Sequence, residues 1–248
     1  MIETDITRAI LEAYNAKLLD RLENDVVIVG AGPAGMVAAY YLAKAGAKVT
    51  MLEKRLATGG GIWGGAAGYN VIAVEDRKII DEFGIGSEKR NGVYVTNAVE
   101  FAAALAYKAQ KAGAEIFNLI EAEDIIVKKD KVVGVVVNST AIKLGNLHVD
   151  PFCIHSKHLV DATGHPAEIV AMLKDRKPDL LPNRIRESFM DVEAAEAGCV
   201  EKTGEIYPSL WVTGMSVCSV YNLPRMGPIF GGMLKSGKKL AELINAKL

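Results

Sequence analysis

Residues 25–54 read DVVIVGAGPAGMVAAYYLAKAGAKVTMLEK, and this stretch decides the fold. Residues 25–29 are a continuous apolar run, as expected for a parallel strand that is buried on both faces. A glycine turn follows at residues 30–35, then a helix of small residues at 35–45 and a second strand at 48–53. This order of strand, turn, helix and strand predicts a Rossmann-like α/β fold.

Three glycines of the turn, Gly30, Gly32 and Gly35, match the G-x-G-x-x-G pattern. The first makes the tight turn, the second lets the backbone approach a pyrophosphate, and the third permits close packing of helix on strand. The following helix directs free N–H groups and its positive dipole end at the phosphates. Because the strand before the turn, the helix after it and the acidic residue Glu53 all fit this pattern, we favour a dinucleotide site over a glycine turn without a ligand.

Glu53 ends the second strand, eighteen residues after Gly35. A carboxylate at this position accepts hydrogen bonds from both ribose hydroxyls of an adenosine and repels a 2′-phosphate. The site therefore favours NAD or FAD over NADP. The motif does not say whether the dinucleotide is a cofactor or a substrate.

The rest of the chain predicts one α/β domain over residues 1–248, of the two-dinucleotide-binding flavoprotein type, with a mainly parallel sheet and a small β-rich insertion. Residues 1–24 hold an N-terminal helix, and residues 173–205 are an excursion rich in charge and proline. The remaining predicted elements are helices at 74–83, 97–112 and 228–246, strands at 114–119, 122–128, 131–138, 158–161 and 210–213, a hairpin turn at 129–130, and loops at 59–68 and 139–151.

Composition excludes several classes of protein. The 248 residues carry a formal net charge of −1 with no basic stretch, so nucleic acid is not an expected partner. No run of eighteen apolar residues is present, and the opening residues lack the apolar core of a signal peptide, so we expect no membrane contact. The cysteines Cys153, Cys199 and Cys218 are odd in number and widely spaced, which favours a reduced, cytoplasmic protein.

Two later segments predict a return of the chain to the same ligand. Residues 210–217 (LWVTGMSV) are a strand that ends at Gly214 and leads towards a glycine-punctuated helix. Residues 159–165 (LVDATGH) resemble the strand–Ala–Thr–Gly segment of two-dinucleotide-binding flavoproteins. On these features alone, an FAD-dependent oxidoreductase is the default function.

Three side chains are candidate metal ligands: His148, Asp150 and His165. In an extended segment His148 and Asp150 point to the same side, and His165 follows the carboxyl end of a predicted strand, where ligands gather in open α/β sheets. Two imidazoles and a carboxylate suit a divalent transition metal such as Fe(II). Spacing alone favours the ordinary alternative, in which the histidines are solvated or hydrogen-bonded and Asp150 before Pro151 starts a turn.

The motifs taken together resemble the thiamine thiazole synthase family over nearly the whole chain. The resemblance rests on VIVGAGPAG, LEK, GGGIWGG, LHVDP, DATGH and VYNLPRMGPIFGGMLKSGKKLAE. It implies a transferase of thiamine biosynthesis in which NAD is consumed. Such an enzyme condenses NAD, glycine and a sulfur source into an adenylated thiazole carboxylate and releases nicotinamide.

Within this family, single-turnover members place a sulfur-donating cysteine where this chain has His148. The chain therefore resembles the branch that uses external sulfide and turns over repeatedly. The resemblance implies that Asp150 and His165 bind Fe(II) from adjacent subunits of a homo-oligomer, an octamer in the family. His148 is then a ligand, a proton shuttle or a group behind the ligands, and these alternatives stay open.

The resemblance also assigns residues to the substrates. Arg225 would bind the carboxylate of glycine, for which a guanidinium fork is suited; the alternative is a surface salt bridge. Pro166 and Ser139 depart from residues common in the family, without removing a proposed ligand. The dinucleotide-binding residues implied are Gly30, Gly32, Ala34 and Gly35 at the pyrophosphate, Glu53 and Lys54 at the adenosine, Gly61 in the covering loop, and Val127 and Met215.

Overall fold

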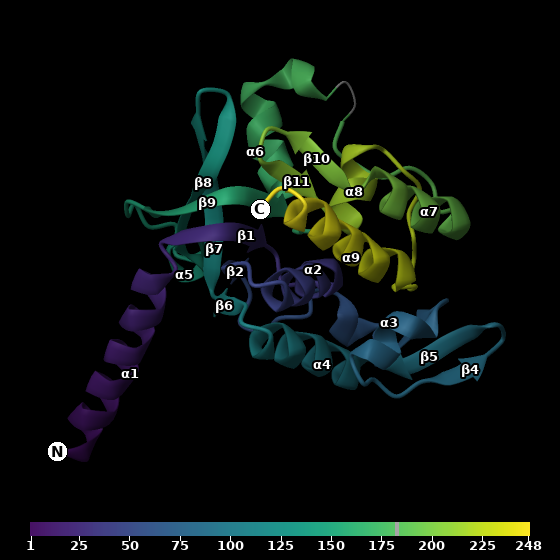
Figure 1. The fold of residues 1–248 in the computed structure, drawn as a ribbon, viewed down its shortest axis with the longest axis horizontal. Coiled ribbons are helices and arrows are strands. Elements are labelled where there is room, and N and C mark those ends of the chain that lie inside the picture. The colour runs from purple at the N-terminus through teal and green to yellow at the C-terminus, as the bar shows by residue number, and fades with distance from the viewer. Residues whose placement is uncertain (182–183) are drawn as a thin grey trace.

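A mainly parallel eight-stranded sheet forms the centre of the computed structural model, which describes residues 1–181 and 184–248 (Figure 1). The main path runs β10-β11-β9-β1-β2-β6, and the hairpin β7–β8 joins it through antiparallel pairing of β8 with β9. These strands are β1 (Glu23–Val29), β2 (Val49–Glu53), β6 (Glu115–Asn118), β7 (Ile120–Lys128), β8 (Lys131–Ser139), β9 (Phe152–Asp161), β10 (Gly204–Tyr207) and β11 (Leu210–Val212). The predicted fold class is confirmed.

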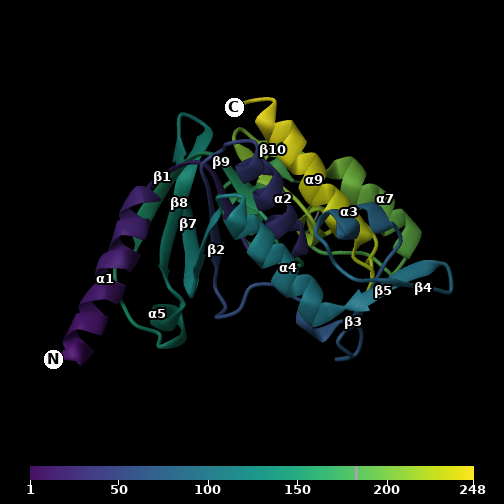
Figure 2. The same cartoon turned by 60° about the horizontal axis from the view of Figure 1, so that its bottom comes forward.

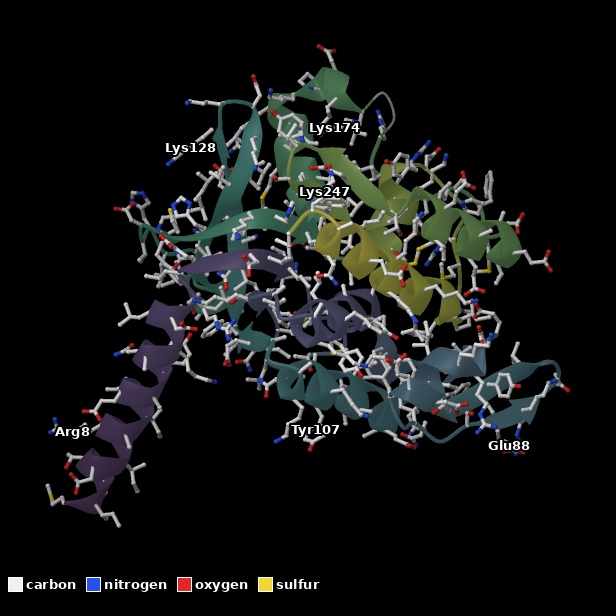
Figure 3. All side chains as sticks on the ribbon, viewed as in Figure 1. Arg8, Glu88, Tyr107, Lys128, Lys174 and Lys247 are labelled. Carbon is white, nitrogen blue, oxygen red and sulfur yellow. The ribbon has the colours of Figure 1, made fainter. Side chains whose placement is uncertain are left out.

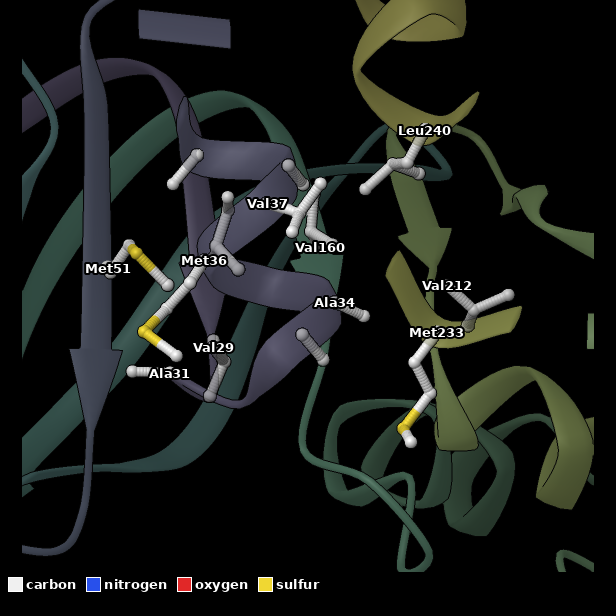
Figure 4. Close-up of a cluster of buried hydrophobic side chains, with 14 of the residues drawn as sticks. Val29, Ala31, Ala34, Met36, Val37, Met51, Val160, Val212, Met233 and Leu240 are labelled. Atoms are coloured by element: carbon white, nitrogen blue, oxygen red, sulfur yellow. The ribbon is translucent and has the colours of Figure 1, made fainter. Parts of the chain in front are cut away.

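The core forms where α2 (Pro33–Lys44) packs on the sheet. β1 pairs in parallel with β2 on one side and β9 on the other, and its central valines and isoleucine are fully buried. Met36 of α2 points towards Met51 of β2, and Leu240 of α9 (Gly231–Asn245) closes the cluster from the other side (Figure 4). α2 itself lies between α4 (Ala98–Lys111) and α9 (Figure 2).

The N-terminal helix α1 (Ile2–Asp20) projects away from the sheet, and none of its residues is buried (Figures 1 and 2). The side chain of Arg8 is exposed and lies on the projecting part of this helix (Figure 3). The contacts of α1 lie in its C-terminal half. The ring centroids of Tyr14 and Phe117 are 5.9 Å apart in an edge-to-face arrangement, and Lys17 Nζ lies 2.7 Å from Glu115 Oε1. No helix in the described part of the chain is both long and apolar enough to cross a bilayer.

A second, three-stranded antiparallel sheet was not predicted. It comprises β3 (Val71–Val74), β4 (Glu88–Arg90) and β5 (Val93–Asn97), and it displaces the first part of the helix expected at residues 74–83. That helix, α3 (Arg77–Glu82), begins later because the side chain of Asp76 accepts a hydrogen bond from the Lys78 N–H and caps it.

Other boundaries also differ from the sequence-based prediction. The expected loop at 139–151 contains the short helix α5 (Thr140–Leu144), and the expected excursion holds α7 (Val192–Lys202) and β10. The last helix begins at Gly231 because the chain before it is held to β3, with the Phe230 N–H donating to the Ala73 carbonyl at 3.0 Å. The helices α6 (Glu168–Arg176) and α8 (Met215–Val220) were also not predicted.

Candidate active site

The glycine turn after β1 is fixed by close contacts of the backbone. A Cβ on Gly30, whose φ is +102°, would lie 2.4 Å from the carbonyl oxygen of Ala162, and one on Gly35 would lie 2.4 Å from the carbonyl of Gly30. These two glycines therefore have the packing roles expected of them. A Cβ on Gly32 would meet nothing within 4 Å, which leaves open space at the amino end of α2 where a pyrophosphate would approach.

The second half of the chain returns to this turn. A Cβ on Gly214, which follows β11, would lie 2.7 Å from the Cβ of Ala34, and one on Gly237 of α9 would lie 2.3 Å from the Ala34 carbonyl. Met215 starts α8 directly after Gly214 and is buried. The predicted strand–glycine–helix return is thus present, and Ala34 is the residue on which it packs.

The glycine-rich loop lies against the turn as well. The Gly59 N–H donates to the Ala31 carbonyl at 2.7 Å, and a Cβ on Gly60 would lie 3.3 Å from the Cα of Gly32. Gly61 is exposed with open space around its Cα. Gly60 has a φ of +56°, which favours glycine, so the loop can lie close against the glycine turn.

Glu53 is buried at the end of β2. Its Oε2 accepts from the Ala31 N–H at 3.0 Å and its Oε1 from the Arg55 N–H at 2.9 Å. Because each carboxylate oxygen has two lone pairs, both can still accept a ribose hydroxyl. Lys54 pairs with Glu168 of α6 at 2.5 Å. The acidic residue predicted at this position is therefore held beside the glycine turn.

The carboxyl end of β9 is organised by Asp161, which is completely buried. Its carboxylate accepts hydrogen bonds from the main-chain N–H groups of Thr163, Ile169 and Val170 at 2.9–3.0 Å and from the Ser216 hydroxyl at 2.9 Å. Burial raises the pKa of the Asp161 carboxyl, and the hydrogen bonds act in the opposite direction. These bonds fix the segment that leads to His165.

His165 and Arg225 are brought together by a third residue, Glu187. Glu187 Oε1 lies 2.5 Å from His165 Nδ1, and Glu187 Oε2 lies 3.6 Å from Arg225 Nε. The side chain of Glu187 is 8% exposed, whereas those of His165 and Arg225 are each 60% exposed. The carboxylate of Glu187 thus contacts both the imidazole and the guanidinium, and these two groups are otherwise largely exposed to solvent.

The other predicted ligands lie elsewhere in the chain. His148 and Asp150 are exposed in the loop before β9, where the Asn138 side chain donates to the Val149 carbonyl at 3.1 Å. His165 follows the opposite end of β9, and a strand of ten residues spans about 30 Å. In the part of the chain that the structure describes, no three His, Cys, Asp or Glu side chains are grouped to hold a metal ion. One copy of the chain therefore does not unite these residues.

Val127 is not placed beside the glycine turn. It pairs with Val132 near the Lys129–Asp130 turn of the β7–β8 hairpin. The amino end of β7 is the end that approaches the segment after β2, because the Leu119 N–H, just before β7, donates to the Arg55 carbonyl at 3.3 Å. Val127 lies near the carboxyl end of the same strand. Among the predicted dinucleotide contacts, Val127 is the one that the structure keeps apart from the rest.

Comparison with known proteins identifies the family. The sequence profile of the Thi4 family matches residues 7–230. The thiamine thiazole synthase of Pyrococcus horikoshii is 50% identical over 99% of this chain and 98% of its own length. The chain belongs to the Thi4 family. The thiamine thiazole synthase of Thermotoga maritima is 46% identical over 98% of this chain and 97% of its own length.

A solved Thi4 structure has the same fold. The crystal structure of Thermovibrio ammonificans THI4 superposes with a TM-score of 0.96 at 44% identity, covering 99% of this chain and 97% of that one. Glu187 was not predicted from the sequence, and the structure places it between His165 and Arg225. No local pattern marks Glu187, because its position depends on hydrogen bonds to residues 219–225 rather than on its own neighbours.

Proposed function

We propose that this chain is a thiamine thiazole synthase that condenses NAD, glycine and external sulfide into an adenylated thiazole carboxylate and releases nicotinamide. The observation that carries the proposal is the placement of the glycine turn, Glu53 and the His165–Glu187–Arg225 group at the carboxyl edge of one sheet. At this edge a bound dinucleotide and the reacting partners would share one site. NAD is then raw material for the reaction and not a hydride carrier.

The chain's own groups can hold NAD in a fixed position. The amino end of α2 offers N–H donors to the pyrophosphate, and Glu53 accepts the ribose hydroxyls. The loop at residues 59–61 covers the turn and restricts water there. Holding the sugar next to a second reactant lowers the entropic barrier to condensation.

Arg225 is the proposed receptor for the glycine carboxylate. Its Nε faces Glu187 at 3.6 Å, and in residues 1–181 and 184–248 no other acidic side chain pairs with it. The two terminal amino groups therefore remain for a second carboxylate, which a guanidinium can bind through two parallel hydrogen bonds. Arg225 does form a salt bridge, as the alternative expected, but its partner is the largely buried side chain of Glu187. This pairing through Nε leaves the terminal amino groups available.

The sulfur is proposed to come from solution. His148 has no sulfur to give, and Cys199 and Cys218 are buried. Cys153 is exposed, but it lies within β9 and beyond the position at which the family places its donor cysteine. Because no side chain would be consumed, the enzyme would turn over repeatedly.

Asp150 and His165 fit an iron site between two copies of the chain. Both side chains are exposed, and with Nδ1 of His165 facing Glu187, its Nε2 is available as a ligand. A carboxylate and an imidazole with open positions suit Fe(II), which would present sulfide and polarise a carbonyl when bound. Since Asp150 precedes β9 and His165 follows it, the two residues lie at opposite ends of the strand, and we propose that each site takes Asp150 from one subunit and His165 from another.

The projecting helix α1 supports a homo-oligomer, for which the family suggests an octamer. Its side chains Ile2, Ile6 and Ile10 are 54–70% exposed, and they recur on one face at helical spacing. An apolar face of this kind is typically covered by another protein surface. The same assembly would bring the loop before β9 to the end of β9 in a second subunit.

The proposal is tested by anaerobic incubation of the protein with NAD, glycine, sulfide and Fe(II), followed by mass spectrometry. We expect nicotinamide and an adenylated thiazole, with more than one product molecule per chain. The control omits sulfide and should yield no thiazole. A purified protein that is yellow with a flavin spectrum, or NAD recovered unchanged, would contradict the proposal and favour an FAD-dependent oxidoreductase.

A further inference from the structure

Glu187 differs from an ordinary surface carboxylate in how firmly its backbone is held. The Arg186 N–H donates to the Ser219 carbonyl at 3.0 Å, and the Ser188 N–H donates to the Leu223 carbonyl at 2.9 Å. The residues on both sides of Glu187 are thus bound to the segment that carries Arg225. An exposed ion pair stabilises little because both side chains must be ordered, but here the carboxylate is ordered beforehand.

The same anchor reaches His165. The hydroxyl of Ser219 donates to the His165 carbonyl at 2.7 Å, and Ser219 also receives the N–H of Arg186. Ser219 is buried in α8, which starts at the end of β11. Ser219 is therefore hydrogen-bonded to the main chains of both His165 and Arg186. This arrangement sets the imidazole opposite the carboxylate of Glu187 without any ligand.

The contact with Glu187 favours one tautomer of the imidazole. An ionised carboxylate only accepts hydrogen bonds, so in a neutral His165 ring the contact of 2.5 Å favours the proton on Nδ1. Nε2 then carries the lone pair. A carboxylate behind a histidine in this way fixes the orientation of the ring and increases its strength as a metal ligand.

The second oxygen of Glu187 acts on Arg225 from the side. It lies 3.6 Å from Nε, and no contact of Glu187 with the terminal amino groups is seen among the described residues. Without Glu187, a side chain that is 60% exposed would sample many rotamers. With it, the guanidinium plane is restrained before a substrate carboxylate arrives.

We propose that Glu187 is a positioning residue that holds His165 as the Nδ1–H tautomer and orients Arg225 for the carboxylate of an amino-acid substrate. The inference rests on the proposed function, in which His165 binds iron and Arg225 binds glycine. Glu187 itself touches neither. A single carboxylate thereby sets the geometry of a metal ligand and of a substrate receptor at once.

The test compares Glu187→Gln and Glu187→Ala with Glu193→Ala, which removes an exposed glutamate of the neighbouring helix α7. The chain has four histidines, so magic-angle-spinning NMR of metal-free protein labelled with 15N-histidine can resolve each ring. A His165→Asn variant assigns the signal. We expect Nδ1–H for His165 in the parent and in Glu193→Ala, and a shift towards Nε2–H in Glu187→Ala.

Binding supplies the second measurement. Anaerobic titration with Fe(II) alone should show an affinity about 10- to 100-fold lower in Glu187→Ala. The KM for glycine should rise in the same variant while the KM for NAD stays unchanged. Glu187→Gln keeps the shape of the side chain and removes its charge. Because its amide oxygen can still accept the Nδ1–H, Fe(II) affinity and the KM for glycine are the deciding measurements for this variant if Glu187→Ala does not fold. A merely structural role would lower the melting temperature without moving the tautomer or the ratio of the two KM values.

The outcomes separate this inference from the proposed function. An unchanged tautomer together with Fe(II) affinity within twofold of the parent in folded Glu187→Ala, or an unchanged Fe(II) affinity and KM for glycine in Glu187→Gln, would overturn the role of Glu187. If His165→Asn loses Fe(II) binding in that case, the proposed iron site still stands. Unchanged Fe(II) binding in His165→Asn would instead overturn the iron site itself.

Discussion

The two ends of β9 differ in how completely one chain builds them. At the carboxyl end, Asp161 accepts four hydrogen bonds from the surrounding backbone and from Ser216, and Glu187 aligns His165. At the amino end, the loop that carries His148 and Asp150 is exposed and is tied through its Val149 carbonyl to Asn138. The side chains at the carboxyl end are thus held by hydrogen bonds and an ion pair, whereas those at the amino end are exposed to solvent.

This difference indicates how the proposed reaction would be distributed between subunits. At the ordered end, the glycine turn, His165 and Arg225 belong to one chain, so under the proposed function this end would bind NAD and glycine without a second subunit. Under the proposed function the exposed end would contribute the carboxylate of Asp150, which lies in the loop before β9 and is exposed. A second chain that supplies Asp150 would complete the site and make activity depend on assembly.

The largest expected effect follows removal of either proposed iron ligand. Asp150→Ala and His165→Ala should each abolish thiazole formation while NAD binding, measured by calorimetry, stays within about threefold, because the glycine turn and Glu53 are untouched. His155→Ala is the matched control, since His155 is an exposed histidine of β9 whose ring contacts the Val133 carbonyl. Full activity of either ligand variant would remove the iron site from the account.

The ordered end can be damaged selectively through its glycines. Gly30→Ala should lower the free energy of unfolding by about 2–6 kcal/mol, because its Cβ would overlap the Ala162 carbonyl and its φ is positive. Gly32→Ala has open space and should change stability by less than about 1 kcal/mol, yet weaken NAD binding about tenfold. Denaturant titration and calorimetry measure both. Equal loss of stability in the two variants would show that the glycines have no separate roles.

A smaller effect is expected from Glu196, which supports the start of α9 by accepting the Gly232 N–H at 2.9 Å. Burial, together with the nearby carboxylate of Glu75, raises the pKa of Glu196 from 4.5 to about 7. The folded protein thus keeps a proton that the unfolded chain releases near pH 4.5, so the contribution to stability is lost as the pH rises from about 4.5 to about 7.

Melting temperatures of the parent and of Glu196→Gln at pH 5 and pH 8 test this sign. At pH 8 the melting temperature of Glu196→Gln should exceed that of the parent, whereas at pH 5 it should not. The difference should be modest because Glu196 is only partly buried. Glu193→Gln on the same helix is the control and should show no such difference. If the melting temperature of the parent rose relative to that of Glu196→Gln as the pH increased, the raised pKa of Glu196 would be contradicted.

The smallest effect on stability is expected in α1. Ile6→Glu should change the free energy of unfolding of the chain by less than about 0.5 kcal/mol, because no residue of α1 is buried. It should nevertheless shift the protein to smaller assemblies in sedimentation velocity, with loss of thiazole formation. Arg8→Glu, on the same helix, separates a change of charge from the apolar contact. An unchanged assembly would exclude this face from the interface.

The sequence predicts the central unit well because its determinants are local. The roles of Gly30, Gly35 and Glu53 follow from their spacing along one strand–turn–helix–strand unit, and the structure confirms the packing of both glycines and the position of the carboxylate. The β7–β8 hairpin was also predictable, since Lys129 and Asp130 are polar residues between two apolar runs and adopt positive φ.

The remaining features depend on contacts between distant segments. β4 consists of Glu88, Lys89 and Arg90, all exposed, so no hydrophobic alternation marks it as a strand. The start of α9 is set by a hydrogen bond to β3, more than 150 residues earlier. Glu187 gains its place through the carbonyls of Ser219 and Leu223. Periodicity and motif spacing carry no information about such pairings.

Mixing two inactive variants tests most directly whether opposite ends of β9 from different chains complete one site. Asp150→Ala and His165→Ala would be unfolded together in equal amounts, refolded, and assayed for thiazole formation beside each variant treated alone. Random assortment gives about a quarter of the sites both wild-type ligands, so we expect about a quarter of the parent activity. Mixtures that stay as inactive as the separate variants, although mass spectrometry shows mixed assemblies, would contradict a site shared between subunits.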